Sequence, residues 1–151
     1  MKNTNEMEII FDSRSINEGF ARVAVSSFMT QLNPTLEEVS DVKTAVSEAV
    51  TNAIIHGYEE EVHKIKISCR LEGKSIWIEV EDKGKGILDV EKAMEPMFTT
   101  KPELERSGMG FAFMEAFMDE LEVISKVGEG TTVKMKKEIG KGRELWTTQP
   151  L

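Results

Sequence analysis

The chain has 151 residues, of which 30% are charged and 40% are apolar, a composition typical of one globular domain. Its net charge of -8 argues against a surface built to bind nucleic acid or an anionic membrane. Cys69 is the only cysteine, which excludes an intramolecular disulfide and a Cys/His metal cluster. The sequence has no apolar signal core and no run long enough to span a bilayer, so we expect a cytoplasmic protein.

The first 34 residues predict a strand followed by a helix. Residues 7–11 largely alternate apolar and polar side chains, as a strand with one buried face does. Residues 15–18 have capping-box spacing, so we expect a helix to begin there and to end before Pro34. The predicted buried face of this helix consists of Phe20, Val23, Ala24 and Phe28. Arg22 lies off that face.

A second predicted helix carries the first candidate site. Residues 35–38 repeat the capping-box spacing, and the apolar periodicity continues to Gly57. Glu48 and Asn52 are four residues apart and are therefore neighbours on the edge of the buried face. An amide oxygen can ligate a hard metal ion, and a carboxylate can act as a base. Taken alone, the pair is more typical of a solvated helix flank.

The next candidate is a carboxylate at the end of a hairpin. Residues 65–71 and 76–80 alternate apolar and polar side chains, which predicts two strands with one buried face. The same alternation places Asp82 on the buried side, where a carboxylate is costly unless hydrogen-bond donors face it. Gly84 and Gly86 follow and allow a close approach of the backbone. A simple turn explains these glycines but not the inward Asp82.

Residues 97–107 form a long aperiodic segment after a short predicted helix at 89–94. Such segments in small domains are often lids or binding loops. Gly108 and Gly110 follow it and precede a helix predicted to start at about Phe111. A glycine-rich helix N-terminus close to Lys101 and Arg106 is suited to a phosphate, although a flexible hinge explains the glycines equally well. The predicted buried face of the helix is Phe111, Met114, Phe117, Met118 and Leu121.

The end of the chain predicts a second hairpin and a tail. Residues 122–127 and 131–136 alternate around the glycines at 128–130. The buried candidates are Val123, Val127, Val133 and Met135. The composition changes after Ile139, so we expect residues 1–139 to form one domain and residues 140–151 to be a disordered or non-native tail.

The order of these motifs carries a family resemblance. Over about residues 8–137 the chain resembles the ATP-binding superfamily of gyrase, Hsp90, histidine kinases and MutL. Three motifs in this order carry the resemblance: a helix with Glu48 and Asn52, a strand end with Asp82-Lys83-Gly84-Lys85-Gly86, and then Gly108-Met109-Gly110. No Walker-type loop or protein-kinase motif set is present. Residues 48–58 and 98–111 look more specifically like the anti-sigma F factors of spore-forming bacteria, which are also serine kinases. That resemblance stops near Gly140.

The resemblance implies a fold and a cofactor set. The fold is a two-layer α/β (α+β) sandwich of the Bergerat ATP-binding type, with a mixed, mostly antiparallel sheet and helices on one face. The cofactors are ATP or ADP with Mg²⁺, and the family implies a homodimer.

The resemblance also implies roles for individual residues. Asp82 would accept a hydrogen bond from the adenine amino group, Asn52 would ligate Mg²⁺, and Glu48 would be the general base. Arg106 is a further catalytic candidate, and Arg22 is a candidate for the partner surface. The remaining nucleotide-binding candidates are Gly84, Gly86, Thr99, Lys101, Ser107, Gly108, Gly110 and Thr131. Whether Thr131 or Thr132 faces the nucleotide is open at this point.

Two protein partners follow from the same resemblance. One is a sporulation sigma factor of the sigma F type, and the other is an anti-anti-sigma factor phosphorylated on a serine; neither nucleic acid nor membrane is a partner. The runner-up is a related partner-switching kinase of a stress-response sigma factor. A third interpretation is an ATP-gated binding module without phosphotransfer. A histidine-kinase catalytic domain is disfavoured because no dimerisation helix with a phosphoacceptor is present.

Overall fold

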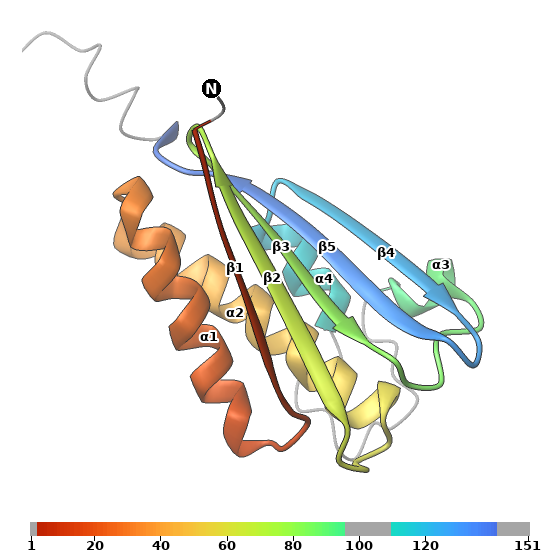
Figure 1. Cartoon of the computed structure of the whole chain (residues 1–151). Coiled ribbons are helices and arrows are strands. Elements are labelled where there is room, and N and C mark those ends of the chain that lie inside the picture. The colour runs from red at the N-terminus through yellow and green to blue at the C-terminus, as the bar shows by residue number, and fades with distance from the viewer. Residues whose placement is uncertain (1–2, 96–109, 142–151) are drawn as a thin grey trace, which may run out of the picture.

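The protein forms two layers, a five-stranded sheet and a layer of helices on one of its faces (Figure 1). The computed structural model describes residues 3–95 and 110–141. The strand order is β1-β2-β3-β5-β4, and all four pairings are antiparallel. The predicted fold class is confirmed, and the sheet is antiparallel throughout the described strands rather than mixed. The strands are β1 (Thr4–Asp12), β2 (Lys64–Glu72), β3 (Ser75–Asp82), β4 (Glu120–Lys126) and β5 (Gly130–Glu138).

The helical layer contains two long helices and several short ones. The elements are α1 (Ile16–Met29), the 3-10 turn η1 (Thr30–Leu32), α2 (Leu36–Asn52), the π-helical turn η2 (Ala53–Gly57), α3 (Val90–Ala93) and α4 (Gly110–Phe117). Helix α2 packs against both α1 and α4. It is therefore the central helix of the layer. Among the described residues, no helix combines the length and the apolar character needed to cross a membrane.

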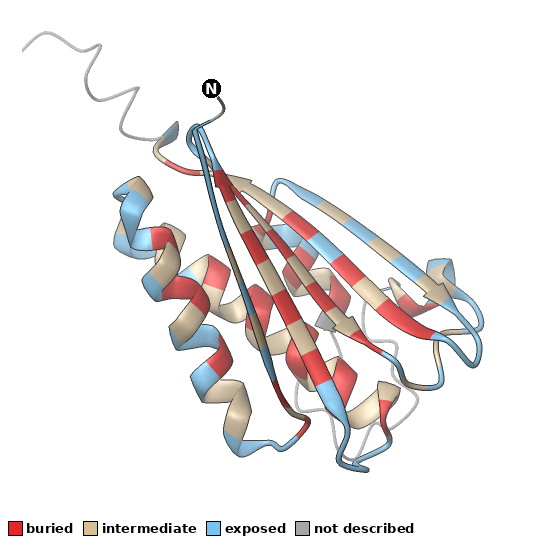
Figure 2. Ribbon diagram, viewed as in Figure 1, coloured by how far each residue is buried: buried red, intermediate tan, exposed pale blue. Residues whose placement is uncertain are grey.

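The core lies between the sheet and the helices. Figure 2 shows buried residues alternating with more exposed ones along β2 and β3, as the sequence predicts. The inward residues include Ile65, Ile67, Ile76 and Ile78, which are completely buried together with Val46 and Val50 of α2. This packing sets which side chains of β3 point towards the core. The alternation continues to the last residue of the strand, so the side chain of Asp82 also points inward.

Helix α1 differs from the prediction. Its buried residues are Ala21, Val25, Ser26 and Met29, whereas Phe20 and Val23 are 55% and 54% exposed. The capping box predicted at 15–18 is also wrong, because Ser15 is already helical and makes no side-chain cap. Instead, Asn17 Nδ2 donates to the carbonyl oxygen of Asp12 at 2.9 Å. In contrast, α2 has the predicted capping box, formed by Thr35 and Glu38.

Helix α4 and strand β4 begin and end earlier than predicted, whereas β5 extends further, to Glu138. Helix α4 ends at Phe117, and Leu121 belongs to β4. Strand β4 ends at Lys126, so Val127 lies in the turn and is 60% exposed rather than buried. The backbone N–H of Gly140 donates to Glu38 Oε2 at 2.8 Å. The proposed boundary after residue 139 stays a prediction, because residues 142–151 lie outside the described residues.

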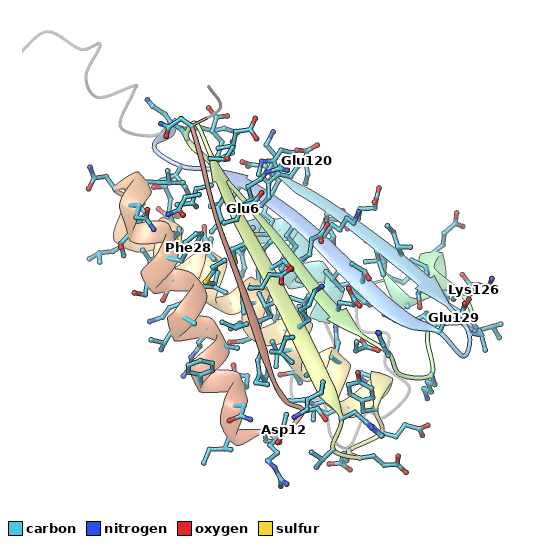
Figure 3. The ribbon with its side chains drawn as sticks, in the orientation of Figure 1. Glu6, Asp12, Phe28, Glu120, Lys126 and Glu129 are labelled. Carbon is cyan, nitrogen blue, oxygen red and sulfur yellow. The ribbon has the colours of Figure 1, made fainter. Side chains whose placement is uncertain are left out.

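The other face of the sheet is polar. Exposed ion pairs cross it, including Lys134 with Glu79 at 3.5 Å and Lys136 with Glu120 at 3.3 Å. Figure 3 shows Glu120 near the same end of this face as Glu6, and Lys126 with Glu129 at the β4–β5 turn. Exposed pairs of this kind contribute little to stability. They keep this face of the sheet hydrated.

Candidate functional site

A pocket of about 600 Å³ opens on the helical side of the sheet. Its walls come from α2 and η2, from the end of β3 with the glycine segment that follows, from α3, from the start of α4, and from β5. Apolar residues make much of the lining, including Ala49, Val80, Phe111 and Val133. An apolar pocket with a few placed polar groups is the usual form of a small-molecule site.

Asp82 is the most unusual polar group in this pocket. Its side chain points inward and the residue is 7% exposed, as the strand parity predicts. The backbone N–H of Gly84 donates to Asp82 Oδ1 at 2.9 Å. Burial raises the pKa of Asp82 to about 6, although hydrogen bonds from the backbone of Gly84 and Thr131 act in the opposite direction. A carboxylate with two acceptor oxygens therefore faces the pocket.

The glycines after Asp82 allow three chain segments to meet. A Cβ atom on Gly84 would lie 2.1 Å from the carbonyl oxygen of Gly57, so no side chain fits there. At Gly86 the φ angle is +76° and a Cβ atom would lie 2.2 Å from the carbonyl oxygen of Lys126. Between them, Lys85 donates from its N–H to Gly57 and accepts from the N–H of Gly128. The glycine segment is thus fixed between η2 and the β4–β5 turn.

Helix α2 supplies the other predicted polar residues. Asn52 is its last residue and lines the pocket. Glu48 is half-buried and lies one turn earlier. It is absent from the lining of the pocket that the described residues form. The helix continues as the π turn η2, and π turns are frequent at functional sites. His56 of this turn also lines the pocket.

The structure decides between the two threonines of β5. Thr131 lies opposite Asp82 in the β3–β5 register, is 8% exposed and lines the pocket. Thr132 lies opposite Glu81 and therefore on the other face of the sheet. Thr131 is the residue that faces the site.

Ser125 lies behind the pocket wall, contacts two residues that line it, Ile87 and Thr131, and was missed by the sequence analysis. Its hydroxyl accepts from the backbone N–H of Ile87 at 2.7 Å and lies 2.8 Å from Thr131 Oγ1. The alternation of side chains along β4 indicates its orientation, because Leu121, Val123 and Ser125 occupy successive inward positions of that strand. Lys92 was missed as well; it is a cation of α3 that lines the pocket.

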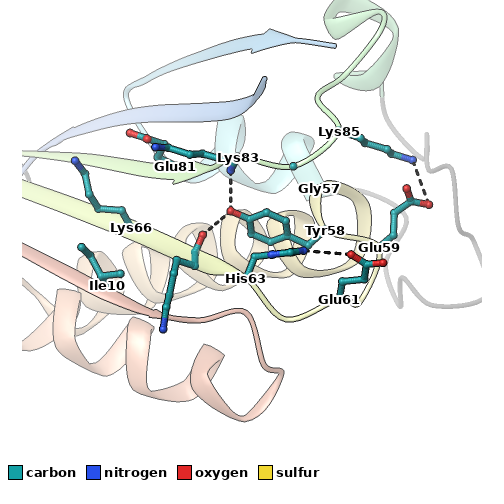
Figure 4. Close-up of a pocket in the computed structure, with 12 residues that line it drawn as sticks. Ile10, Gly57, Tyr58, Glu59, Glu61, His63, Lys66, Glu81, Lys83 and Lys85 are labelled. Atoms are coloured by element: carbon teal, nitrogen blue, oxygen red, sulfur yellow. Dashed lines mark hydrogen bonds and ion pairs between the residues drawn. The ribbon is translucent and has the colours of Figure 1, made fainter. Parts of the chain in front are cut away.

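A second hollow, of about 830 Å³, adjoins the site on its outer side (Figure 4). The Tyr58 hydroxyl accepts from the backbone N–H of Lys83 at 2.7 Å and donates to the carbonyl oxygen of Lys64. The tyrosine ring packs against His63 with a centroid distance of 4.9 Å. Tyr58 therefore holds the start of the glycine segment in place from outside the pocket.

The other predicted residues lie elsewhere. Thr99, Lys101, Arg106, Ser107 and Gly108 belong to residues 96–109, which lie outside the described residues. Gly110 is the first residue of α4. Arg22 is on α1, where it is exposed and pairs with Glu18 at 3.7 Å. It does not line the pocket.

The comparisons with known proteins agree with this geometry. The family described as histidine kinase-like ATPase domain matches residues 12–137. An anti-sigma F factor of Thermoanaerobacter sp. (strain X514) is 59% identical over 93% of this chain and 98% of the relative. The anti-sigma F factor of Bacillus subtilis (strain 168) is 53% identical over 93% of this chain and 97% of the relative.

Solved structures support the fold. A structure with RsbU and RsbW domains from Mycobacterium tuberculosis has a TM-score of 0.65 at 22% identity, covering 89% of this chain and 32% of that one. A histidine kinase domain from Erythrobacter litoralis has a TM-score of 0.56 at 18% identity, covering 88% of this chain and 66% of that one. The family match over residues 12–137, and the 59% and 53% identity to anti-sigma F factors over almost their whole length, place the chain in the anti-sigma F factor family, with a histidine kinase-like ATPase domain.

Proposed function

We propose that the chain acts in the cytoplasm as an ATP-dependent switch. It binds and inhibits a sigma factor of the sigma F type, and it phosphorylates a serine of an anti-anti-sigma factor. The observation that carries the proposal is the buried Asp82 carboxylate in a largely apolar pocket that Asn52 also lines. This combination supports a nucleotide site, and the relatives are named for the anti-sigma role.

The pocket fits an adenine nucleotide. Asp82 can accept from the adenine amino group, while Ala53, Val80 and Val133 offer apolar contacts to the base. Gly84 and Gly86 let the segment that forms this wall pack closely against the backbone of Gly57 and Lys126. We assign the phosphates to Lys101, Arg106, Ser107 and the backbone amides of residues 108–110, with Thr99 beside them. This part of the proposal rests on the sequence alone.

Two residues of α2 would serve the transfer step. The Asn52 amide oxygen suits Mg²⁺, which supplies positive charge against the phosphates when it is bound. Glu48 would take the proton of the incoming serine hydroxyl as its oxygen attacks the γ-phosphate, with ADP as the leaving group. Phosphoryl transfer depends mostly on positioning and charge neutralisation, which these residues can provide.

The partner surface is proposed on α1, around Arg22. Ile16, Phe20 and Val23 are 84%, 55% and 54% exposed, and Arg22 is an exposed arginine of the same helix. Exposed apolar residues with an arginine are typical of protein interfaces. The homodimer also belongs to this proposal, on the family resemblance alone.

Arg22→Ala should weaken binding of the sigma factor by about fivefold or more, because an arginine at an interface hot spot contributes more than about 1 kcal/mol. Its ATP affinity should not change, since Arg22 does not line the pocket. Lys74→Ala is the matched control, because Lys74 is an exposed cation in the β2–β3 turn. Titration calorimetry with the sigma factor measures both variants; equal affinity of Arg22→Ala and wild type would remove Arg22 from the interface.

A binding experiment tests the proposal as a whole. The chain is immobilised and exposed to a sigma F type factor or to a stress-response sigma factor, with ATP, ADP or no nucleotide. We expect capture of the sigma F type factor, stronger with ATP than without nucleotide. Capture of the stress-response factor alone would favour the related partner-switching kinase, and nucleotide-dependent capture without any phosphotransfer would favour a binding module.

A further inference from the structure

A short strained loop lies between the wall of the pocket and the start of α1. The loop consists of residues 58–63, which connect η2 to β2. Two consecutive residues in it, Glu59 and Glu60, have left-handed backbone conformations, with φ angles of +52° and +69°. Among the residues that the structure describes, Asn33 is the only other non-glycine residue with a positive φ. This conformation is costly for glutamate, so contacts around the loop must hold it in place.

Tyr58 fastens one end of the loop to the glycine segment of the pocket (Figure 4). The residue is 7% exposed. Its hydroxyl accepts from the backbone N–H of Lys83 at 2.7 Å and donates to the carbonyl oxygen of Lys64. The ammonium group of Lys85 lies 3.9 Å from the carboxylate of Glu59. The start of the loop is therefore held by two residues of the glycine segment.

Ser13 fastens the other end of the loop to the segment that precedes α1. It is 2% exposed. Its N–H donates to the carbonyl oxygen of His63 at 2.8 Å, and the N–H of His63 donates back to Ser13 Oγ at 2.9 Å. The hydroxyl of Ser13 donates in turn to the carbonyl oxygen of Glu61 at 2.9 Å. Three hydrogen bonds thus connect one buried serine to the end of the loop.

The segment that contains Ser13 also contacts the first turn of α1. Asp12 precedes Ser13, and its carbonyl oxygen accepts from Asn17 Nδ2 at 2.9 Å. Asn17 lies in that first turn, and the next residue, Glu18, pairs with Arg22 at 3.7 Å. Contacts therefore continue from the loop to the helix on which the partner surface is proposed.

We propose that residues 58–63 couple the nucleotide pocket to the partner surface on α1, with Tyr58 and Ser13 as the positioning residues at the two ends of the loop. A bound nucleotide restricts the glycine segment, and Tyr58 extends this restriction to the loop. Ser13 then holds the first turn of α1 in one position, which lowers the cost of ordering it when a protein partner binds. This inference rests on the proposed function and adds the route by which the nucleotide acts on partner binding.

Amide hydrogen exchange tests this route without a protein partner. Amides at a helix end exchange by local opening rather than by global unfolding. In the wild type, saturating ADP should slow exchange in residues 13–18 by about fivefold, the equivalent of one hydrogen bond. In Tyr58→Phe, which removes only the hydroxyl, the slowing should be lost at saturating ADP. The turn η1, which follows the other end of α1, is the internal control and should show no slowing in either protein.

Binding of the sigma factor gives the second measurement. The ratio of its affinity with ATP to its affinity without nucleotide expresses the coupling. Tyr58→Phe and Ser13→Ala should each lower this ratio by about fivefold, whereas Ser68→Ala, on the polar face of β2, should keep it. The double variant should lose no more than either single variant, because both residues act in one route. A merely structural role would weaken both affinities equally and leave the ratio unchanged.

The outcomes separate this inference from the function on which it rests. A wild-type ratio of one would contradict the proposed nucleotide switch itself. With a wild-type ratio above one, two results would overturn the coupling role of the loop and leave the switch intact. The first is no slowing of exchange in residues 13–18 of the wild type, and the second is persistence of either effect in a folded Tyr58→Phe. The same criteria apply to Ser13→Ala if Tyr58→Phe does not fold.

Discussion

Glu48→Gln is expected to lower the rate of phosphotransfer to the anti-anti-sigma factor by about 10²–10⁴-fold, the contribution of a general base. Glutamine has nearly the same shape but cannot take the proton of the serine hydroxyl. ATP affinity and sigma factor binding should stay at their wild-type values, because Glu48 does not line the described pocket. Single-turnover transfer of labelled phosphate measures the rate, and calorimetry measures the two affinities.

The control for this variant is Glu37→Gln, which removes a carboxylate from the exposed first turn of the same helix. It should transfer phosphate at the wild-type rate. If Glu48→Gln also transfers at the wild-type rate, the general base is another group and the assignment of Glu48 is wrong.

Asp82→Asn should weaken ATP binding by about 1–3 kcal/mol, or roughly 5- to 150-fold. The N–H of Gly84 needs an acceptor, so the asparagine oxygen turns towards it. The asparagine NH₂ group then faces the adenine amino group, donor against donor. Calorimetry with ATP measures the loss, and Glu79→Gln on the polar face of β3 is the matched control.

The same substitution should stabilise the nucleotide-free chain. The pKa of Asp82 is raised from 3.8 to about 6 in the folded chain, so the folded chain binds more protons than the unfolded chain between these pH values. The contribution of Asp82 to the free energy of unfolding should therefore fall as pH rises through this window, by at most about 3 kcal/mol. Asp82→Asn should abolish the fall. Denaturant unfolding at pH 4 and pH 7 measures the free energy of unfolding of both proteins. The same change between the two pH values in wild type and Asp82→Asn would contradict a buried, ionisable Asp82.

ATP affinity should have the opposite pH dependence. The ligand needs the ionised carboxylate, so wild-type affinity should decrease as pH falls through about 6. In Asp82→Asn the affinity should change less over this range. Asp82 thus lowers the stability of the free chain above its pKa and raises the affinity for the nucleotide.

The alternation of inward and outward side chains along β3 predicts the inward position of Asp82, the buried carboxylate of the site. The same rule applied to β4 identifies Ser125 as an inward residue. What the sequence lacks is the register that sets both residues beside Thr131. Register depends on pairing between distant segments, which a single sequence does not specify. The choice between Thr131 and Thr132 therefore needed the structure.

The buried face of α1 shows a different limit. Phe20 and Val23 are apolar and spaced as a buried face would be, yet both are largely exposed. The helical spacing of apolar residues predicts an apolar face, but it does not show whether that face packs in the core or forms an exposed binding surface. The capping box at Thr35 is confirmed. The same spacing at residues 15–18 forms no cap, because Ser15 is itself helical.

The most direct test of the central claim is transfer of the γ-phosphate of ATP to a protein serine. The chain is incubated with Mg²⁺, γ-labelled ATP and a candidate anti-anti-sigma factor, and the label is located by mass spectrometry. We predict a label on one serine of the partner, dependent on Mg²⁺ and lost in Glu48→Gln. Label on a histidine of the chain itself, or nucleotide-dependent binding of the partner with no label on it, would contradict the account.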